Sequence, residues 1–203
     1  MRTGLIGAIV AVVALSGAGG ARAGAIGCAP APARVVSRSG GARLYVEGGA
    51  LYGCVAARRT LLGGAPGSRH LGATRVRLYA LASRYAGFDT VLMGVDTLNS
   101  SVSVVDLATG ATLTSAPATT PENRAESFIA VTSIVIDRHG TVAWIGSRSA
   151  VGAFTPIYEV HALDAEGQDR LLASGVAIAP RSLALTGETL SWRQRGRART
   201  ATI

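Results

Sequence analysis

The chain has 203 residues with 20 basic and 12 acidic side chains, so its formal net charge is +8 at neutral pH. This length suits one domain with a sizeable core or a small array of repeats, and leaves too little room for two ordinary domains. All the basic residues are Arg, which together with abundant Ala and Gly fits a bacterial genome rich in G and C and says nothing about chemistry.

Segment 1–23 has the three parts of a cleavable secretory signal peptide. Arg2 makes the start positive, the apolar run Gly4–Leu15 follows, and Ala21–Ala23 forms an A-x-A cleavage site. As a helix, the apolar run would span about 18 Å, short of the roughly 30 Å of bilayer hydrocarbon, so a transmembrane helix is the weaker interpretation. The longest later apolar run, Phe128–Ile136, fits a buried strand, and we expect no transmembrane anchor after cleavage.

Removal of the signal peptide leaves 180 residues with 18 Arg against 12 acidic residues, a net charge of +6. This charge favours anionic surfaces as partners. From the signal peptide of segment 1–23, we expect a secreted, extracellular protein.

The alternative to free secretion is a lipid anchor at Cys28. This cysteine follows Ala25–Gly27 and so loosely resembles the lipoprotein box of bacterial lipoproteins. Families with that box usually carry Leu at the position of Ala25 and place the cysteine directly after the apolar core. Here a Gly-rich stretch containing Arg22 intervenes, and the resemblance is correspondingly loose.

Cys28 and Cys54 are the two cysteines of the chain, and export places them in an oxidising compartment. We predict a disulfide between them, which would tether the N-terminal segment 24–41 and contribute roughly 3 to 4 kcal/mol by closing a loop. Two free thiols, or a lipidated Cys28, are the alternatives. A catalytic cysteine is disfavoured because no His lies near either cysteine in sequence.

The remainder, residues 42–203, predicts an all-β domain. Short runs of Val, Leu, Ile, Thr and Tyr alternate with clusters of Gly, Asp, Asn and Ser, as strands alternate with turns. No stretch of ten or more residues keeps a helical apolar stripe, so we expect almost no helix.

The predicted strands recur in a repeating order. Ile134–Trp144, Leu183–Trp192 and, more loosely, Leu78–Phe88 each read as an apolar strand, a polar turn with Gly and a second strand that reaches an aromatic residue. Hairpins that turn at Asp and Gly, Val104–Gly110 and His161–Gly167, follow two of them. A period of this size with four strands per unit is typical of a propeller blade.

Asp137–Gly140 with Val142–Trp144 resembles the WD40-like repeat of TolB-type β-propellers, in which a strand, a P-D-G-type turn and a strand ending in an aromatic residue follow one another. Ile136 stands where that family usually has Pro. The resemblance implies a propeller-like architecture whose loops face protein or ligand partners, and it implies no active site.

The repeats add up to about three four-stranded units. Val76–Pro117 and Phe128–Gly175 supply two whole units, while Arg43–Gly64 and Ser182–Ile203 supply partial units that we expect to pair in one blade. Three blades are one fewer than the smallest usual ring. The alternatives are a closed ring with a further blade or an open, curved array whose edges are covered, with a homodimer as one way to cover them.

No histidine has the spacing of a metal site or a catalytic set, and we predict no metal, no cofactor and no catalytic residue. The chain has three histidines, His70, His139 and His161. We expect His139 to lie in a solvated turn and His161 to be an ordinary side chain on a strand. The chain also lacks a G-x-S-x-G elbow, a P-loop and a dinucleotide-binding fingerprint.

Oxygen-bearing side chains at Asp96, Asn99 and Ser100 would suit Ca²⁺, but the segment has too few carboxylates at alternate positions. We therefore predict a turn there, and turns at Asp106 and Asp164, since Asp and Asn stabilise turns with their own side chains.

Arg193, Arg195, Arg197 and Arg199 alternate with other residues, and a continuous strand would place all four on one face. Such a face could bind a polyanion, such as a teichoic acid or a nucleic acid backbone. It could equally be a charged edge that prevents aggregation, which is the interpretation we favour. Nucleic acid is disfavoured because no aromatic residues interleave to stack on bases.

From the sequence we expect a secreted, non-catalytic binding or scaffold module of the bacterial cell envelope or extracellular space. Its partner would be a protein or an anionic envelope polymer. The alternative is an extracellular hydrolase whose carboxylate pair, or Ser, His and Asp set, converges on the loops between strands.

Overall fold

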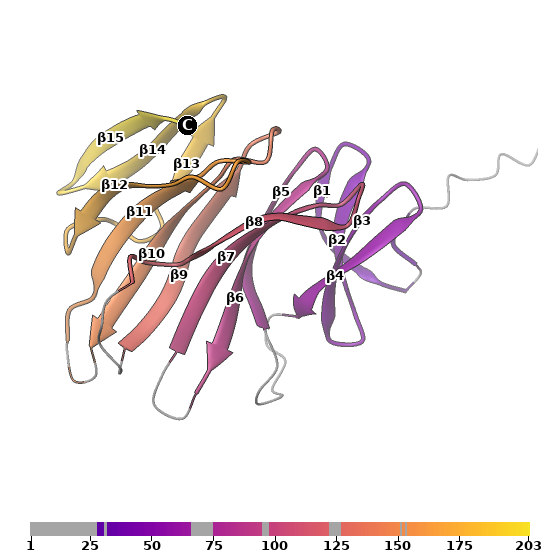
Figure 1. Cartoon of the computed structure of the whole chain (residues 1–203), viewed down its shortest axis with the longest axis horizontal. Helices are drawn as coiled ribbons and strands as arrows, with labels where there is room; N and C mark the ends of the chain where they lie inside the picture. The colour runs from indigo at the N-terminus through magenta and orange to yellow at the C-terminus, as the bar shows by residue number, and fades with distance from the viewer. Residues whose placement is uncertain are drawn as a thin grey trace, which may run out of the picture.

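The computed structural model describes residues 28–30, 32–65, 75–94, 98–121, 127–150, 152 and 154–203. Their regular secondary structure is all β strand, which confirms the predicted fold class (Figure 1). No helix in the described part of the chain is long and apolar enough to cross a membrane. The predicted signal peptide lies outside the described residues.

The strands form four antiparallel meanders in chain order. Meander I consists of β1 (Arg34–Ser39), β2 (Ala42–Glu47), β3 (Ala50–Val55) and β4 (Arg58–Gly64). Meander II consists of β5 (Arg75–Ala82), β6 (Tyr85–Met93), β7 (Leu98–Asp106) and β8 (Ala111–Pro117). Meander III consists of β9 (Ser127–Ile136), β10 (Val142–Ala150), β11 (Ile157–Leu163) and β12 (Asp169–Gly175). Meander IV consists of β13 (Ala184–Thr186), β14 (Thr189–Gln194) and β15 (Arg197–Thr202).

Parallel contacts join meanders I, II and III into one mixed sheet of twelve strands, while meander IV forms a separate three-stranded sheet. Each contact is a single residue pair, Gly64 with Arg75 and Leu98 with Phe128. The described strands therefore form no closed ring.

The predicted pairing of the first and last segments in one blade is wrong. Arg34–Ser39 forms β1 and pairs with β2, so the first meander already has four strands of its own. This strand also lies inside segment 24–41, which the sequence had led us to place before the β domain. Meander IV pairs with no strand of meander I in the described part of the chain.

One hydrophobic core lies between each pair of consecutive meanders, because a single meander cannot bury its apolar face alone. The core between meanders I and II includes Leu44, Leu51, Val76 and Phe88. The core between meanders II and III includes Val102, Val104, Val142 and Trp144. The core between meanders III and IV includes Ile145, Val160, Leu190 and Trp192.

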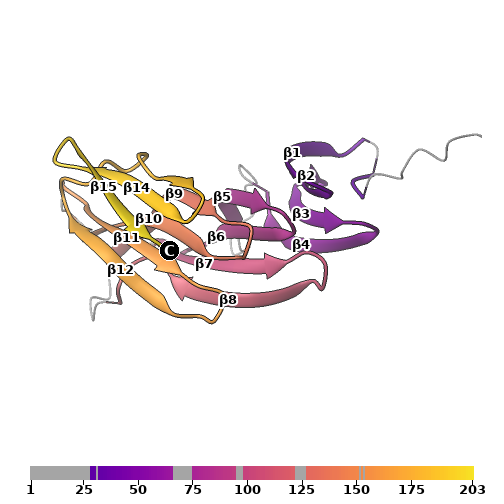
Figure 2. The same ribbon diagram turned by 90° about the horizontal axis from the view of Figure 1, so that it is seen from above.

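The first strands of the meanders line one side of the molecule. Figure 2 shows β1, β5 and β9 along that side and β4, β8 and β12 along the opposite side. Along this side β5 contacts both β1 and β9, and β9 also contacts β13. Surface features that lie along β9 are therefore bordered by strands of three meanders.

The predicted turns at Asp106 and Asp164 are confirmed. Asp106 Oδ1 accepts a hydrogen bond from the N–H of Ala108, and Asp164 Oδ1 accepts one from the N–H of Gln168. The turn predicted around Asn99 and Ser100 is wrong, because both residues lie in β7 and pair with β6. Asp96 lies outside the described residues.

Candidate functional site

Cys28 and Cys54 form the predicted disulfide, with their Cα atoms 5.7 Å apart. Cys54 lies buried in the third strand of meander I. The bridge therefore tethers the segment before β1 to the first meander, and no free cysteine is found in the described part of the chain.

Two open hollows follow one another along β9, on the side of the molecule that the first strands form. One, of about 680 Å³, has Val131 and Thr132 on β9, Arg77 and Leu78 on β5, Tyr158 on β11 and the segment Ala179–Ser182 in its lining. The other, of about 880 Å³, has Ile134–His139 from β9 and its turn, Ala80 and Leu81 from β5, and Leu185 and Gly187–Thr189 from the β13–β14 hairpin in its lining. We call the two hollows together the β9 trough.

A buried carboxylate shapes one wall of the trough. Asp89 on β6 is fully buried, and its Oδ1 accepts hydrogen bonds from the N–H groups of Arg77 at 2.8 Å and Leu78 at 2.6 Å. The β5–β6 register is irregular at this point, so the two residues face the trough while their amides face Asp89. Burial raises the pKa of Asp89, because loss of hydration disfavours the anion more than the two amide hydrogen bonds favour it.

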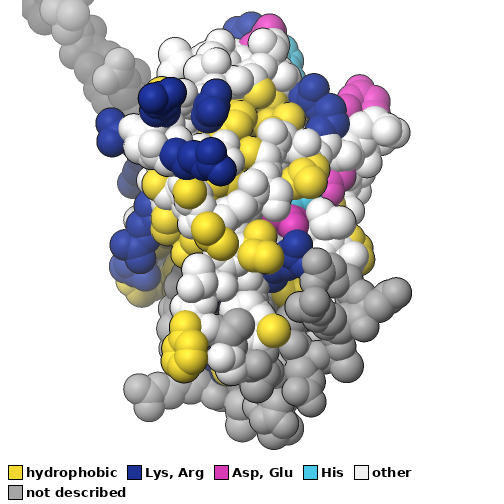
Figure 3. All heavy atoms as spheres, turned by 90° about the vertical axis from the view of Figure 1, so that its left-hand side faces the viewer, with side chains coloured by type: hydrophobic (Ala, Val, Ile, Leu, Met, Phe, Trp, Pro, Cys, Tyr) yellow, Lys and Arg dark blue, Asp and Glu magenta, His cyan; other side chains and the backbone are white. Residues whose placement is uncertain are grey.

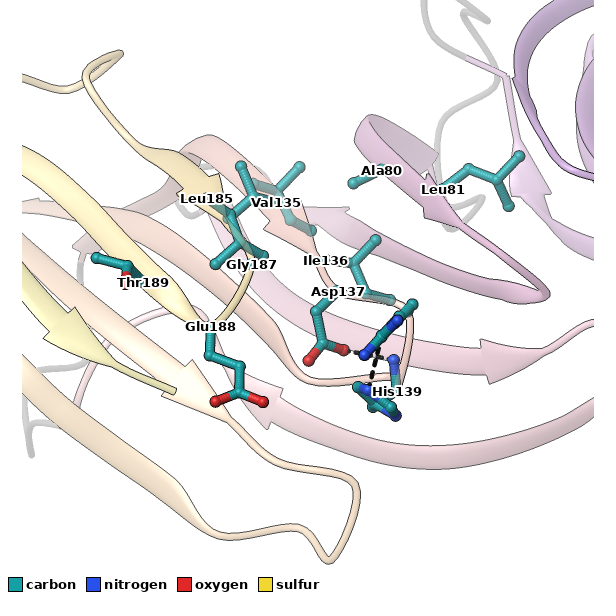
Figure 4. A pocket seen from close by; sticks show the side chains of 12 residues that line it. Ala80, Leu81, Val135, Ile136, Asp137, His139, Leu185, Gly187, Glu188 and Thr189 are labelled. Carbon is teal, nitrogen blue, oxygen red and sulfur yellow. Dashed lines mark hydrogen bonds between the residues drawn. The ribbon is translucent and has the colours of Figure 1, made fainter.

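Acidic side chains lie at the other end of the trough. Figure 4 shows Asp137 and His139 in the turn after β9 and Glu188 in the β13–β14 turn across the gap. Asp137 Oδ1 accepts hydrogen bonds from the N–H groups of His139 at 2.8 Å and Thr141 at 2.9 Å, and so stabilises its own turn. Glu188 is exposed, and no hydrogen bond or ion pair of its carboxylate is found with a described residue. His139 is exposed in this turn, as predicted, and its Nε2 accepts a hydrogen bond from Arg138 Nε at 2.9 Å.

The four alternating arginines do not lie on one continuous strand. Strand β14 ends at Gln194, and Arg195 and Gly196 form a two-residue turn with φ values of 53° and 73°. Arg193 pairs with Ala198, whereas Arg199 pairs with Trp192 and Arg197 with Gln194. Arg193 therefore points to the opposite face of the hairpin from Arg197 and Arg199, which corrects the predicted common face. The Gly at position 196 was the sequence signal for this turn.

The arginine hairpin is hydrogen-bonded to the segment that borders the trough. Ala179 N–H donates to the carbonyl of Arg193 at 2.9 Å, and Arg193 N–H donates to Ser182 Oγ at 2.8 Å. Arg181, between these contacts in sequence, lines the trough. Figure 3 looks onto this end of the molecule and shows Arg side chains gathered in its upper part. We call the exposed arginines of the hairpin and of the neighbouring hollow the basic surface: Arg77, Arg181, Arg193, Arg195, Arg197 and Arg199. It spans both faces of the hairpin, since Arg197 and Arg199 lie opposite Arg193.

A charged cluster that the sequence did not reveal lies buried in meander III. His161 and Glu159 are each only 2% exposed, so the prediction that His161 merely decorates a strand is wrong. His161 Nε2 lies 3.0 Å from Glu159 Oε2, and His161 Nδ1 lies 3.0 Å from Asp169 Oδ1. Arg148 Nε lies 3.2 Å from Glu159 Oε1, and the Trp144 ring stacks on the imidazole with centroids 5.0 Å apart.

This cluster holds the segment Ala118–Thr120, which follows β8, against meander III. Trp144 Nε1 donates to the Ala118 carbonyl at 2.8 Å, and Thr120 N–H donates to Glu159 Oε2 at 2.7 Å. Gly146 makes the close approach feasible, because a Cβ there would lie 1.9 Å from the Ala118 oxygen. We call Ala118–Thr120 the strap.

The protonation of Glu159 reflects these contacts. Burial alone raises the pKa of Glu159, but hydrogen bonds from Thr120 and His161 and the charge of Arg148 outweigh burial and lower it below the usual range. The anion is therefore the stable form in the folded protein. Because Glu159 and His161 are buried, their contacts stabilise the fold of meander III.

No group of three or more His, Cys, Asp or Glu side chains that could hold a metal ion occurs within the described ranges. His70 lies outside them. The sequence matches no protein-family model and no curated protein. Function is therefore inferred from the surfaces described above.

Proposed function

We propose that the protein is a secreted, non-catalytic binding module of the bacterial cell envelope that binds an anionic envelope polymer through the basic surface. The observation that carries this proposal is the hydrogen-bonded contact between the hairpin of Arg193 and the segment of Arg181. It holds exposed arginines of two segments next to each other, beside an open trough.

The chemistry of arginine suits such a partner. A guanidinium group binds a phosphate or carboxylate through two parallel N–H donors, and several such groups along one surface bind a repeating anion cumulatively. Because each neutralised phosphate releases condensed counterions, binding of this kind weakens steeply as salt rises.

Secretion is supported by the signal-peptide pattern of segment 1–23 together with the Cys28–Cys54 bridge, which is typical of an oxidising compartment. The bridge also occupies the sulfur atom that a lipid anchor at Cys28 would need. Free secretion is thus the better supported of the two locations.

We interpret the architecture as an open, propeller-like array. Its meanders pack face to face and their first strands lie along one side, as the blades of a propeller do around an axis. In the described part of the chain, meander I shares a hydrophobic core with meander II alone and meander IV with meander III alone, so each leaves a sheet face at an end of the array. A homodimer that covers such a face stays a prediction.

The hydrolase alternative has no comparable support. Asp137 and Glu188 line the trough, but Oδ1 of Asp137 accepts two backbone hydrogen bonds of its turn. The histidine with two carboxylate partners, His161, is buried under the strap.

The test compares two triple variants of equal net charge in binding to fluorescein-labelled inorganic polyphosphate. Arg77, Arg181 and Arg193 are changed to Gln in one, and the exposed residues Arg34, Arg38 and Arg58 of meander I in the other. We expect the first variant to lose about tenfold or more in affinity and the second about twofold or less, with affinity falling as salt rises. Equal losses in the two variants, or no binding by the wild type, would contradict the proposal.

A further inference from the structure

One edge of β9 has almost no strand partner. On one side β9 pairs with β10 from Ser127 to Ile136. On the other, its pairing within the described residues is the single contact of Phe128 with Leu98. Alternate residues of an antiparallel strand turn their N–H and C=O groups away from the partner strand, so β9 presents unpaired backbone groups along the trough. Such an edge is a template for an added strand.

The trough has the dimensions and walls that an extended chain requires. From Val131 to Asp137 the floor runs for about 20 Å, at about 3.3 Å per residue, which accommodates roughly six residues of extended peptide. The middle of the trough is apolar, with Ala80 and Leu81 on one wall and Leu185 on the other. Apolar side chains of an added strand would find complementary surface there.

The two ends of the trough carry opposite charges. Arg77 and Arg181 lie at the Val131 end, and Asp137 and Glu188 lie at the other. Arg138 is also at the acidic end, where its Nε is directed to the ring of His139. A uniform polyanion would meet two carboxylates there, whereas a chain with one acidic and one basic end would complement both ends.

We propose that the β9 trough binds an extended peptide segment of a partner protein, which adds a strand to the free edge of β9. An acidic side chain of that segment lies against Arg77 and Arg181, a basic side chain lies against Asp137 and Glu188, and apolar side chains fill the space between them. This mode of recognition gives affinity through backbone hydrogen bonds and specificity through side-chain pockets. The site shares Arg77 and Arg181 with the basic surface, and adds to them an acidic end and apolar walls that polymer binding does not use.

The test uses labelled hexapeptides and fluorescence anisotropy. Acetyl-Lys-Val-Thr-Val-Thr-Glu-amide and its reverse charge order, Glu-Val-Thr-Val-Thr-Lys, cover both strand directions, and Gln-Val-Thr-Val-Thr-Gln is the neutral control. We expect one charged peptide to bind about tenfold more tightly than the neutral one. Methylation of alternate peptide nitrogens should weaken binding about tenfold, because it removes the hydrogen bonds to β9.

Two variants locate the site. Glu188→Gln, at an exposed position, should remove most of the advantage of the charged peptide and leave neutral-peptide binding unchanged. Ala80→Trp should fill the trough and weaken all peptides. Both variants should keep the wild-type affinity for polyphosphate, which separates failure of this site from failure of polymer binding.

Three results would overturn the proposal. The first is equal binding of charged and neutral peptides, and the second is insensitivity to N-methylation. The third is equal affinity of Glu188→Gln and wild type for the charged peptide, which would mean that the acidic end of the trough takes no part in binding. Self-association of the protein that Ala80→Trp abolishes would assign the edge to a second copy of the chain, and would equally overturn a separate partner.

Discussion

His161 Nε2 lies 3.0 Å from Oε2 of Glu159, two residues earlier on the same strand, while its other ring nitrogen lies 3.0 Å from Asp169. Residues two apart on a strand share a face, which is why the first pair meets. Oε2 of Glu159 also accepts a hydrogen bond from the N–H of Thr120, so the contact with His161 fixes the carboxylate that holds the strap.

Glu159→Gln should lower the free energy of unfolding by about 2 to 4 kcal/mol at pH 7, because Arg148 and His161 lose their buried anionic partner. The pKa of Glu159 is lowered in the folded protein, so its contribution is present above the unfolded glutamate value of about 4.3 and is lost as pH falls through the folded value. Urea unfolding at pH 7, 5 and 3 should therefore show the difference from wild type shrinking towards acid pH. Glu166→Gln, at an exposed position in the β11–β12 turn, is the control; a pH-independent difference for Glu159→Gln would refute the assignment.

Trp144→Phe should cost more stability than Trp192→Phe, although both indoles are buried. Trp144 donates a hydrogen bond to the strap and stacks on His161, whereas the Trp192 Nε1 has no hydrogen-bond partner within the described residues. We expect the two losses to differ by about 1 kcal/mol or more in chemical denaturation. Equal losses would mean that the strap contact contributes no net stability.

Asp89→Ala should destabilise the fold by about 2 to 3 kcal/mol, because the amides of Arg77 and Leu78 lose their acceptor inside the protein. Asp89→Asn keeps an acceptor and removes a buried charge, so its change should stay within about 1 kcal/mol.

The pH dependence of Asp89 has the opposite sign to that of Glu159. Because its pKa is raised in the folded protein, the contribution of the protonated carboxyl favours folding at low pH and declines as pH rises from the unfolded value near 3.9 through the folded value. The Asn variant should lack this decline in pH-dependent unfolding. A wild type whose stability rises through the same range by the same amount as the variant would argue against the assignment.

Replacing both Cys28 and Cys54 by Ala should lower the free energy of unfolding by about 3.5 kcal/mol, the value expected for a loop of this size. The measurement is thermal and denaturant unfolding with and without reductant. Reductant should destabilise the wild type by a similar amount and leave the double variant unchanged. If reductant has no effect on the wild type, the bridge is absent in solution.

Features set by neighbouring residues were predictable from the sequence. The turns at Asp106 and Asp164 follow from Asp and Gly a few positions apart, because an aspartate side chain accepts hydrogen bonds from amides just after it. The disulfide followed from two cysteines and a predicted export signal. In both cases the residues allow few alternative structures: an Asp–Gly segment favours a turn, and two cysteines allow one intramolecular pair.

Features that depend on distant segments were not predictable in the same way. His161 is buried because Asp169 comes from the next strand and the strap comes from another meander, and neither is visible from residues near His161. The arginines were misassigned because alternation fits a strand as well as a hairpin, and the Gly at position 196 decides between them. The predicted pairing of the first and last segments was wrong because β1 lies before the predicted β domain and completes the first meander.

The open order of the meanders has an evolutionary consequence. Each hydrophobic core belongs to two neighbours only, and no strand pairing within the described residues joins the first meander to the last. A closed ring fixes its number of blades, because every blade must meet two others. In this arrangement a terminal meander can be added or lost without rebuilding the remaining cores, provided that the meander left at the end has a polar outer face.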